Sequence, residues 1–227
     1  MAKISIVIPC YNEEDNIGEC IRKIPEMNCE SEIIVVDDGS TDRTAECARE
    51  SQRPFLKVIR YEKNLGMGAA LRTGLQYATG DIIVLLDADY TSPPSEIPKI
   101  IEPILDGKAD FVTGTRFIYT MEQNAMKTVH RLGNKIAAFM VSLYVGQHIT
   151  DSLCGLKAFK RKLLIGKLKE NSWPDFELLI TAKKNKMRIV ELPIHYRARK
   201  AGASKMNTFK GFYRMPILLI KSFIGIN

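Results

Sequence analysis

Two aspartates separated by one residue give the sequence its strongest indication of chemistry. Asp87 and Asp89 flank Ala88 at the end of an apolar run, residues 81–86, that is typical of a buried strand. In extended backbone, residues i and i+2 point to the same side, so both carboxylates would face one ligand. Mg²⁺ and Mn²⁺ prefer oxygen ligands and often share a diphosphate with one or two carboxylates. The pair predicts a metal–diphosphate site, although the short pattern alone is also compatible with a polar strand end.

A second acidic cluster, Asp37-Asp38-Gly39-Ser40, follows the apolar run 33–36. Its carboxylates can accept hydrogen bonds from a nucleobase edge or from ribose hydroxyls. The same residues also suit a turn followed by a helix N-cap. The cluster on its own leaves both interpretations open.

Gly66-Met67-Gly68 follows another predicted strand and resembles part of a dinucleotide-binding fingerprint. Leu71 stands where the third glycine is required, and the motif follows the third strand instead of the first. We therefore expect no nicotinamide or flavin site here. A close approach between a helix start and a ligand is the better interpretation.

Basic residues offer partners for phosphate groups. Arg116 ends a predicted strand, and Arg199 and Lys205 bracket a loop that contains Gly202 and Ser204. The histidines have no metal-ligand spacing, and no Ser/His/Asp arrangement is legible. Cys154 has no evident base nearby, so it is not expected to be a nucleophile.

The elements that must position these residues alternate between strand and helix patterns. Apolar, β-branched runs occur at residues 4–8, 33–36, 56–61, 81–86, 110–115 and 188–195, and helical patterns separate most of them. A long apolar helix is expected over 129–145, another helix over 173–184, and a turn-like segment over 150–159. Buried strands with helical crossovers predict an α/β fold with a mostly parallel central sheet and helices on both faces. Ligands of such sheets bind beyond the carboxyl ends of the strands, where all these polar clusters fall.

Composition and charge exclude several classes of protein. The 227 residues are 45% hydrophobic and 26% charged, which excludes wholesale disorder and a polytopic membrane protein. The formal charge of +7 favours an anionic partner. A basic nucleic-acid-binding protein rests on that charge alone, because no recognition motif is present, and no nucleic-acid partner is expected. Five scattered cysteines without a CxxC pair suit a reducing compartment.

Taken in order, the motifs resemble those of a known family. They are Pro9-Cys10-Tyr11-Asn12-Glu13, Asp37-Asp38-Gly39-Ser40-Thr41-Asp42, Asn64-Leu65-Gly66-Met67-Gly68, Gly80-Asp81 and Asp87-Ala88-Asp89. The ordered set is similar to that of the inverting GT-A glycosyltransferases. Within them it resembles the branch containing dolichol-phosphate mannose synthase and related polyprenyl-phosphate glycosyltransferases. The resemblance runs from about Ile4 to Lys205 and implies a GT-A fold.

The resemblance also implies roles for individual residues. The nucleotide-sugar would be bound by Pro9, Tyr11, Glu13, Val36, Asp37, Asp38, Asp87, Ala88, Asp89, Arg199 and Lys205. Asp87 and Asp89 would bind Mg²⁺ or Mn²⁺, and Arg199 would face the donor diphosphate. Arg116 and Arg131 would receive the phosphate of a lipid acceptor. The residues expected to carry the reaction are Asp89, Arg116, Arg131, Asp151 and Arg199.

The implied reaction moves a sugar, with inversion, from a nucleotide-sugar to a polyprenyl (dolichyl) phosphate. GDP-mannose is the first expectation for the donor, with UDP-glucose or UDP-GlcNAc behind it. Tyr90-Thr91 replaces the Leu-Gln that often follows the DAD motif in this branch, which weakens the inference to mannose. A sugar hydroxyl as acceptor is the alternative, and it would require a base, for which Asp151 is the first choice. A catalytically dead nucleotide-sugar binder is disfavoured by the intact Asp87 and Asp89.

A lipid acceptor would bring the protein to a membrane surface. No run approaches the roughly 20 apolar residues needed to span a bilayer, so peripheral association with the cytoplasmic face is expected. We expect a GT-A domain over residues 1–207 and an amphipathic membrane-interface segment over 208–227. That segment mixes aromatic and aliphatic residues with Lys210, Arg214 and Lys221.

Overall fold

The computed structural model describes residues 2–123, 125–169, 171 and 174–201. One seven-stranded sheet has the order β3-β2-β1-β4-β6-β5-β7. Its strands are β1 (Ile4–Cys10), β2 (Ser31–Asp37), β3 (Leu56–Arg60), β4 (Ile82–Leu85), β5 (Phe111–Thr115), β6 (Lys157–Lys160) and β7 (Ile189–Pro193). The helices are α1 (Glu14–Arg22), α2 (Thr44–Glu50), α3 (Met67–Tyr77), α4 (Ile97–Leu105), α5 (Thr128–Val145), α6 (Arg161–Leu164) and α7 (Pro174–Lys184), with a 3₁₀ turn at Pro94–Glu96.

The first four strands form a parallel half-sheet. β1 pairs with β2 on one side and β4 on the other, and β2 pairs with β3. Every residue of β1 and β4 is buried, which explains why their sequences are apolar apart from Ser5. Because these strands run in one direction, the loops that follow them meet at one edge of the sheet.

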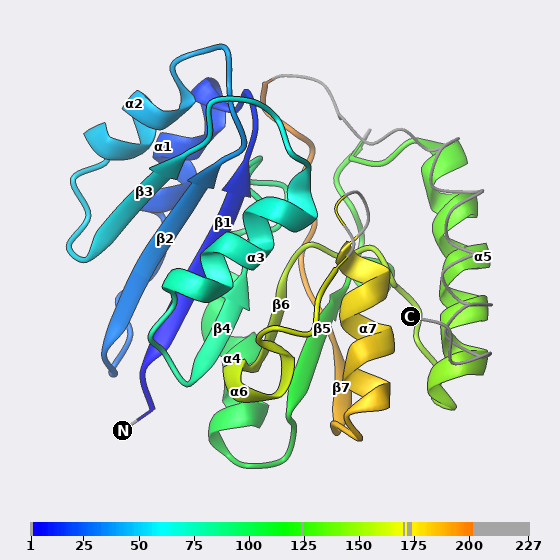
Figure 1. Ribbon diagram of the computed structural model, residues 1–227. Coiled ribbons are helices and arrows are strands. Elements are labelled where there is room, and N and C mark those ends of the chain that lie inside the picture. The colour runs from blue at the N-terminus through cyan, green and yellow to red at the C-terminus, as the bar shows by residue number, and fades with distance from the viewer. Residues whose placement is uncertain (1, 124, 170, 172–173, 202–227) are drawn as a thin grey trace.

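Helices cover both faces of the sheet, as the alternation predicted. Ile6 and Ile8 of β1 share a core cluster with side chains of α1, α2 and α4. Val7 points to the opposite face, in a cluster with side chains of α3, α5 and α7. Figure 1 shows α3 across the near face of the sheet and α5 beyond α7, at the side farthest from β3. The prediction of an α/β fold with a mostly parallel sheet is confirmed.

β6 contradicts the prediction of a turn-like segment over 150–159. It runs antiparallel to both of its neighbours, β4 and β5, and separates them. Its sequence has apolar Ala158 and Phe159 between Lys157 and Lys160, which does not read as a buried strand. Lys157 is nevertheless fully buried, because its ammonium group has partners inside the protein.

The predicted boundary at residues 207 and 208, and with it the C-terminal segment, lies outside the described residues. Within the described part of the chain, none of the helices combines the length and the apolar character needed to cross a bilayer.

Candidate active site

The loops after β1 and β2 are joined by hydrogen bonds into one unit. Asn12 has a left-handed backbone, with φ of 51°, and its N–H donates to Ser40 Oγ over 2.8 Å. The Thr41 N–H returns a bond to Asn12 Oδ1, also 2.8 Å. The Glu13 N–H donates to Thr44 Oγ1 over 2.8 Å. Two segments expected to bind the base and the ribose are therefore held together by their own polar groups.

Asp38 ties a third loop to these two. Its Oδ1 accepts the Leu65 N–H at 2.7 Å, and its Oδ2 accepts the Gly66 N–H at 2.9 Å. Gly66 begins α3 with φ of 97°, and a Cβ on it would lie 2.7 Å from the Asn171 carbonyl oxygen. Only glycine fits that combination. Asp38 thus positions the glycine loop, a contact that the sequence alone did not reveal.

The neighbouring predicted donor residues sit at the same edge of the sheet. Pro9 and Val36 are register partners at the ends of β1 and β2. Asp37 is fully buried, accepts the Ser40 N–H at 2.9 Å and lies 3.4 Å from Arg60 Nε. Tyr11 is half-buried on the loop that follows β1. Lys205 lies outside the described residues.

Asp87 occupies a tight place beyond the end of β4. A Cβ on Gly155 would lie 1.7 Å from Asp87 Oδ2 and 2.1 Å from its Cγ, so the Gly155 backbone packs directly against the carboxylate. Burial, and then the negative charge of Asp89, raise the pKa of Asp87 to about 7. Gly155 was not recognised as a site residue, because only this long-range contact shows why it is a glycine.

A buried ion pair lies behind this contact. Lys157 donates to Asp175 Oδ1 and to the Cys154 carbonyl oxygen, and its side chain is fully buried. The pair joins β6 to the start of α7 and holds the turn that carries Gly155. The positive charge of Lys157 partly offsets the burial of Asp87. Sequence reasoning missed both residues, since an isolated lysine usually lies on the surface.

Asp89 is oriented by donors from two residues, Thr91 and Arg199. Its Oδ1 accepts the Thr91 N–H at 3.0 Å and the Thr91 hydroxyl at 2.7 Å. Its Oδ2 accepts Arg199 Nη2 at 2.5 Å, and Arg199 Nη1 reaches Glu13 Oε1 at 2.9 Å. Arg199 therefore connects the first loop with the DAD motif. Thr91 stands where the related branch often has glutamine, and its two hydrogen bonds orient the side chain of Asp89.

The donor set suits a hard divalent cation held jointly with a diphosphate. Among the described residues, no group of three or more His, Cys, Asp or Glu side chains is arranged to hold a metal ion. The carboxylates of Asp87 and Asp89 are close enough for one to raise the pKa of the other. Two neighbouring carboxylates provide a partial set of oxygen ligands, which Mg²⁺ or Mn²⁺ would complete with phosphate oxygens and water.

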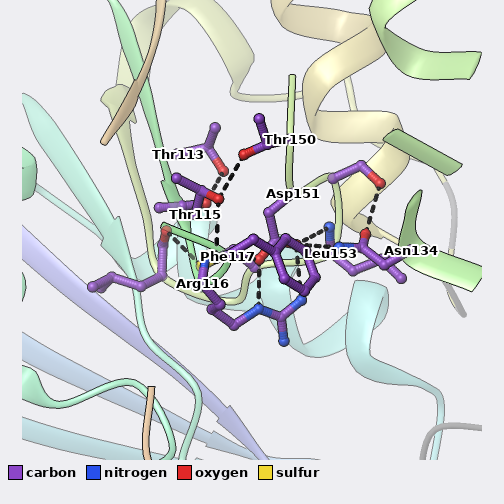
Figure 2. A network of polar contacts seen from close by, with 12 residues as sticks. Thr113, Thr115, Arg116, Phe117, Asn134, Thr150, Asp151 and Leu153 are labelled. Carbon is purple, nitrogen blue, oxygen red and sulfur yellow. Dashed lines mark hydrogen bonds and ion pairs between the residues drawn. The ribbon is translucent and has the colours of Figure 1, made fainter. Parts of the chain in front are cut away.

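Arg116 and Asp151 form a second, buried cluster at the end of β5 (Figure 2). Arg116 Nε donates to Asp151 Oδ2 at 2.6 Å, and Nη2 donates to Oδ1 at 2.8 Å. Asp151 also accepts Asn134 Nδ2 at 2.8 Å and the Leu153 N–H at 3.2 Å. Its backbone N–H donates to Glu191 of β7 at 2.9 Å. Helix α5 and strands β5 and β7 thus converge on one ion pair.

This geometry argues against the role of general base considered for Asp151. Both carboxylate oxygens are engaged by donors, and the charge of Arg116 keeps the pKa of Asp151 below its usual value despite complete burial. A carboxylate so occupied is a poor proton acceptor, because it must break these bonds first. Asp151 instead fixes the Arg116 guanidinium through two of its nitrogens.

Arg116 and Arg131 approach the same aromatic ring. The Arg116 guanidinium lies 6.0 Å, and that of Arg131 5.9 Å, from the Phe117 ring centroid. Tyr196 stacks on Arg116 at 4.9 Å. Beside them lies a cavity of about 370 Å³, lined by Phe117, Tyr119, Thr120, Met121, Glu122, Ala125, Met126 and Arg131. Of the two predicted phosphate-binding arginines, Arg131 lines this partly apolar cavity, and Arg116 approaches a ring that lines it.

The remaining reactive side chains are structural. Cys154 is buried, which raises the pKa of its thiol to about 12 and keeps it protonated. His195 Nδ1 lies 2.6 Å from Glu96 Oε1, and its ring stacks on Tyr119 at 4.6 Å.

Comparison with known proteins agrees with this geometry. The family described as glycosyl transferase family 2 matches residues 5–166. The UDP-N-acetylglucosamine–dolichyl-phosphate N-acetylglucosaminyltransferase of Methanococcus voltae is 34% identical in an alignment 241 positions long that covers 95% of each chain. The undecaprenyl-phosphate 4-deoxy-4-formamido-L-arabinose transferase of Salmonella newport is 32% identical over 89% of this chain, which spans 62% of that protein.

A solved structure matches the whole chain. Glucosyl-3-phosphoglycerate synthase from Mycobacterium tuberculosis, crystallised with Mn²⁺, UDP-glucose and glycerol 3-phosphate, superposes with a TM-score of 0.76 at 25% identity. The match covers 100% of this chain and 81% of that one.

Proposed function

The chain belongs to glycosyl transferase family 2 and has the GT-A fold, and on this premise we propose that it transfers a sugar from a nucleotide-sugar to a polyprenyl phosphate. The acceptor phosphate oxygen attacks the anomeric carbon, the bond from that carbon to the donor diphosphate breaks, and a nucleoside diphosphate leaves. Attack from the side opposite the leaving diphosphate would invert the anomeric configuration.

The proposed donor is UDP-GlcNAc. The relative that matches 95% of this chain is named for UDP-N-acetylglucosamine, and the superposed synthase was crystallised with UDP-glucose. The first expectation from the sequence, GDP-mannose, has no such support and remains a comparison in the test. UDP-glucose is the second candidate donor, because the superposed synthase was crystallised with it.

The donor half of the site rests on the joined loops after β1, β2 and β3 and on the DAD motif after β4. Of the carboxylates predicted for the base and ribose, Asp37 and Asp38 would hold the surrounding loops in place, because Asp37 is fully buried and both oxygens of Asp38 accept backbone N–H groups. Ala88 is buried between the two aspartates of the DAD motif. Asp87 and Asp89 would hold Mn²⁺ or Mg²⁺, which when bound neutralises the charge that develops on the leaving diphosphate. The guanidinium of Arg199 lies 2.5 Å from Asp89 and would contribute a second positive charge beside the leaving diphosphate.

The observation that carries the acceptor assignment is the pair of arginines beside Phe117. Asp151 holds Arg116 by Nε and Nη2, so Nη1 remains to meet a phosphate oxygen, and Arg131 approaches the same ring from α5. Two guanidinium groups beside a partly apolar cavity fit a phosphate that carries a hydrocarbon chain. A phosphate ester is ionised near neutral pH and needs no strong base. This agrees with the occupied carboxylate of Asp151.

A polyprenyl phosphate acceptor places the enzyme at a membrane surface. The reducing compartment indicated by the cysteines, all five of which are unpaired, favours the cytoplasmic face. We propose peripheral association there.

The test is a panel of radiolabelled donors with polyprenyl phosphate, with and without EDTA. UDP-GlcNAc, UDP-glucose and GDP-mannose are compared, and the label extracted into organic solvent is counted. We expect transfer from UDP-GlcNAc that EDTA abolishes and Mn²⁺ restores. Absence of metal-dependent transfer to the lipid from every donor would overturn the proposal. Transfer from GDP-mannose alone would overturn the choice of donor only.

A further inference from the structure

We propose that Tyr90 is a positioning residue for the donor site. Its ring holds residues 197–200, the basic segment, against the DAD motif and thereby keeps Arg199 beside Asp89. The inference deepens the proposed function, on which it rests for the nucleoside diphosphate that Arg199 meets. Tyr90 had no predicted role of its own.

The basic segment needs partners to stay in one place. Its cations are Arg197, Arg199 and Lys200. Like charges this close repel one another. Two backbone bonds hold the start of the segment, since the Arg197 N–H donates to the Thr91 carbonyl oxygen at 2.9 Å and the Ala198 N–H donates to Glu122 Oε2 at 2.8 Å. These bonds do not fix the cationic side chains, which depend on other contacts.

The ring of Tyr90 contacts two of the three cations. The Arg197 guanidinium lies 5.5 Å from the ring centroid, and its Nη1 lies 3.3 Å from the Tyr90 hydroxyl. Lys200 Nζ lies 5.3 Å from the same centroid and 2.8 Å from Glu19 Oε1 of α1. The face of an aromatic ring attracts a cation within about 6 Å of its centroid. One ring therefore holds a residue on each side of Arg199 in the chain.

Arg199 is held at the DAD motif as a consequence. Its guanidinium bonds Asp89 at 2.5 Å and Glu13 at 2.9 Å. Tyr90 follows Asp89 directly in the chain, so one turn carries both the anion that Arg199 binds and the ring that holds its neighbours. A diphosphate that takes the guanidinium from Asp89 leaves the contacts with the ring intact. Arg199 then stays at the site while its partner changes.

The backbone of Tyr90 supports a specific role for its side chain. Its φ of 61° lies in the left-handed region, which favours glycine and asparagine over a bulky residue. Such a conformation is kept when other contacts offset its strain. The side chain is only 8% exposed and belongs to the core cluster. Leucine, which the related branch often has here, would also fill a core position, but it offers the cations neither a ring face nor a hydroxyl group.

The first test is hydrogen–deuterium exchange of the full chain without ligands, read at the amides of Arg197 and Ala198. Both amides are hydrogen-bonded and exchange when the basic segment opens. Two cation–π contacts together change an equilibrium constant by roughly five- to thirtyfold. We therefore expect Tyr90→Leu to speed this exchange about tenfold. Tyr90→Phe keeps the ring and should stay within about threefold of the wild type.

Tyr77→Leu is the matched control. Tyr77 ends α3 and also has a cation over its ring, Lys57 at 3.9 Å. We expect this variant to leave the exchange of the basic segment unchanged. The amides of β1 serve as an internal reference, because they report unfolding of the whole protein and not local opening.

The second test is isothermal titration with UDP and Mn²⁺, or with GDP if the wild type binds GDP more tightly. We expect Tyr90→Leu to raise the Kd about threefold or more, toward the value of Arg199→Gln. Tyr90→Phe should recover most of the affinity. In the Arg199→Gln background, Tyr90→Leu should add less than about twofold, because the residue that it positions is already absent.

Four outcomes would overturn the positioning role. They are equal exchange in Tyr90→Leu and the wild type, faster exchange with unchanged nucleotide affinity, wild-type affinity in Arg199→Gln, and a loss in the Arg199→Gln background as large as in the wild type. The last would mean that Tyr90 acts on Asp89 directly. A wild type that binds neither nucleotide would overturn this inference and the proposed function together. Nucleotide binding without transfer to polyprenyl phosphate would count against the proposed function alone.

Discussion

The carboxylate of Asp87 has no space on the side where Gly155 lies. A methyl group on Gly155 would overlap it at 1.7 Å, so either the turn or Asp87 must move. We predict that Gly155→Ala lowers the affinity for Mn²⁺ by about tenfold or more, because a metal ligand is displaced. Isothermal titration with Mn²⁺ in the presence of UDP measures this directly.

The matched control is Gly18→Ala on α1. A Cβ there meets the flexible end of Arg22 at 3.2 Å and a backbone oxygen at 3.4 Å. We expect unchanged Mn²⁺ affinity and equal or slightly higher stability, since alanine is favoured over glycine in a helix by about 0.5–1 kcal/mol. An unchanged metal affinity in Gly155→Ala would contradict the positioning role of Gly155.

Substitution of Asp151 distinguishes a phosphate acceptor, which needs no general base, from a hydroxyl acceptor, for which Asp151 would be the base. In Asp151→Asn the buried Arg116 loses its anion, and we predict that the free energy of unfolding falls by about 3–5 kcal/mol. At a temperature where the variant is folded, the KM for polyprenyl phosphate should rise while kcat falls only modestly. Loss of a general base would instead reduce kcat by about 10²–10⁴. Urea unfolding and steady-state kinetics measure the two effects, and a kcat loss of that size would restore the hydroxyl-acceptor mechanism.

At the residue scale, the sequence predicted types of side chain better than their contacts. Asp87 and Asp89 could be recognised because residues i and i+2 at the end of an apolar run point to the same side and can face one ligand. The partners of Asp38, by contrast, are backbone N–H groups 27 and 28 residues away. Gly155 and Asp87 are likewise far apart in the sequence, although the backbone of one packs against the carboxylate of the other. Such contacts depend on the tertiary fold, which local patterns do not contain.

Between elements, the Lys157–Asp175 pair is the main polar connection from β6 to α7. Removing one partner leaves the other charge buried, so we predict that Lys157→Met lowers the free energy of unfolding by about 3–5 kcal/mol. The double variant Lys157→Met/Asp175→Leu should recover most of that loss, since no buried charge is left unpaired. Chemical denaturation of both variants tests this, and a double variant as unstable as the single one would refute it.

Asp110 connects three strands and makes the free energy of unfolding depend on pH in the acidic range. Its carboxylate lies at the start of β5 and binds Lys160 of β6 at 2.5 Å and Arg188, before β7, at 2.9 Å. Hydrogen bonds from Arg188 and Lys160 lower the pKa of Asp110 well below the ordinary value of 3.8. The ionised Asp110 therefore contributes its full stabilisation at pH values above 3.8, its ordinary pKa. This stabilisation is lost as the pH falls through the lower pKa of the folded state.

We predict that Asp110→Asn lowers the free energy of unfolding at pH 7 by about 1–2 kcal/mol. The difference from the wild type should shrink at acidic pH, once Asp110 is protonated in both states of the wild type. Asp106→Asn makes the same change at an exposed surface pair and should have little effect. Urea titrations across pH measure all three proteins, and a difference that does not depend on pH would contradict the prediction.

Elements with one dominant pattern were predicted well, and β6 was not. The two central strands of the parallel half-sheet, β1 and β4, are almost entirely apolar because both their faces are covered. β6 spans four residues, and two of these are lysines. Its first lysine is buried only because Asp175 of α7 is present to bind it. A local pattern cannot include a partner from another helix.

For the whole molecule, ligand binding should appear as added stability. A ligand at about 100 times its Kd adds about 2.7 kcal/mol if it binds only the folded state. We predict that UDP with Mn²⁺ raises Tm by several degrees, while UDP with EDTA or GDP with Mn²⁺ has a smaller effect. Differential scanning fluorimetry gives the comparison. A larger shift with GDP would contradict a uridine nucleotide as donor carrier.

The alternation of strand and helix was sufficient to predict an α/β fold with helices on both faces, and the ordered motifs were sufficient for the GT-A family. The order of the strands was beyond such reasoning. β5 precedes β6 in the chain but lies outside it in the sheet. No local signal indicates which strand fills the place next to β4.

The position of β6 has a consequence for how the chain is made. β1 to β4 have all of their mutual partners by residue 85, so this half of the sheet can form while the rest is still being synthesised. β5 borders only β6 and β7, both of which come later. It must wait for residues 157–160 before it can join the sheet. The donor-binding loops are thus available to fold early, and Arg116 reaches its final place only after most of the protein has left the ribosome.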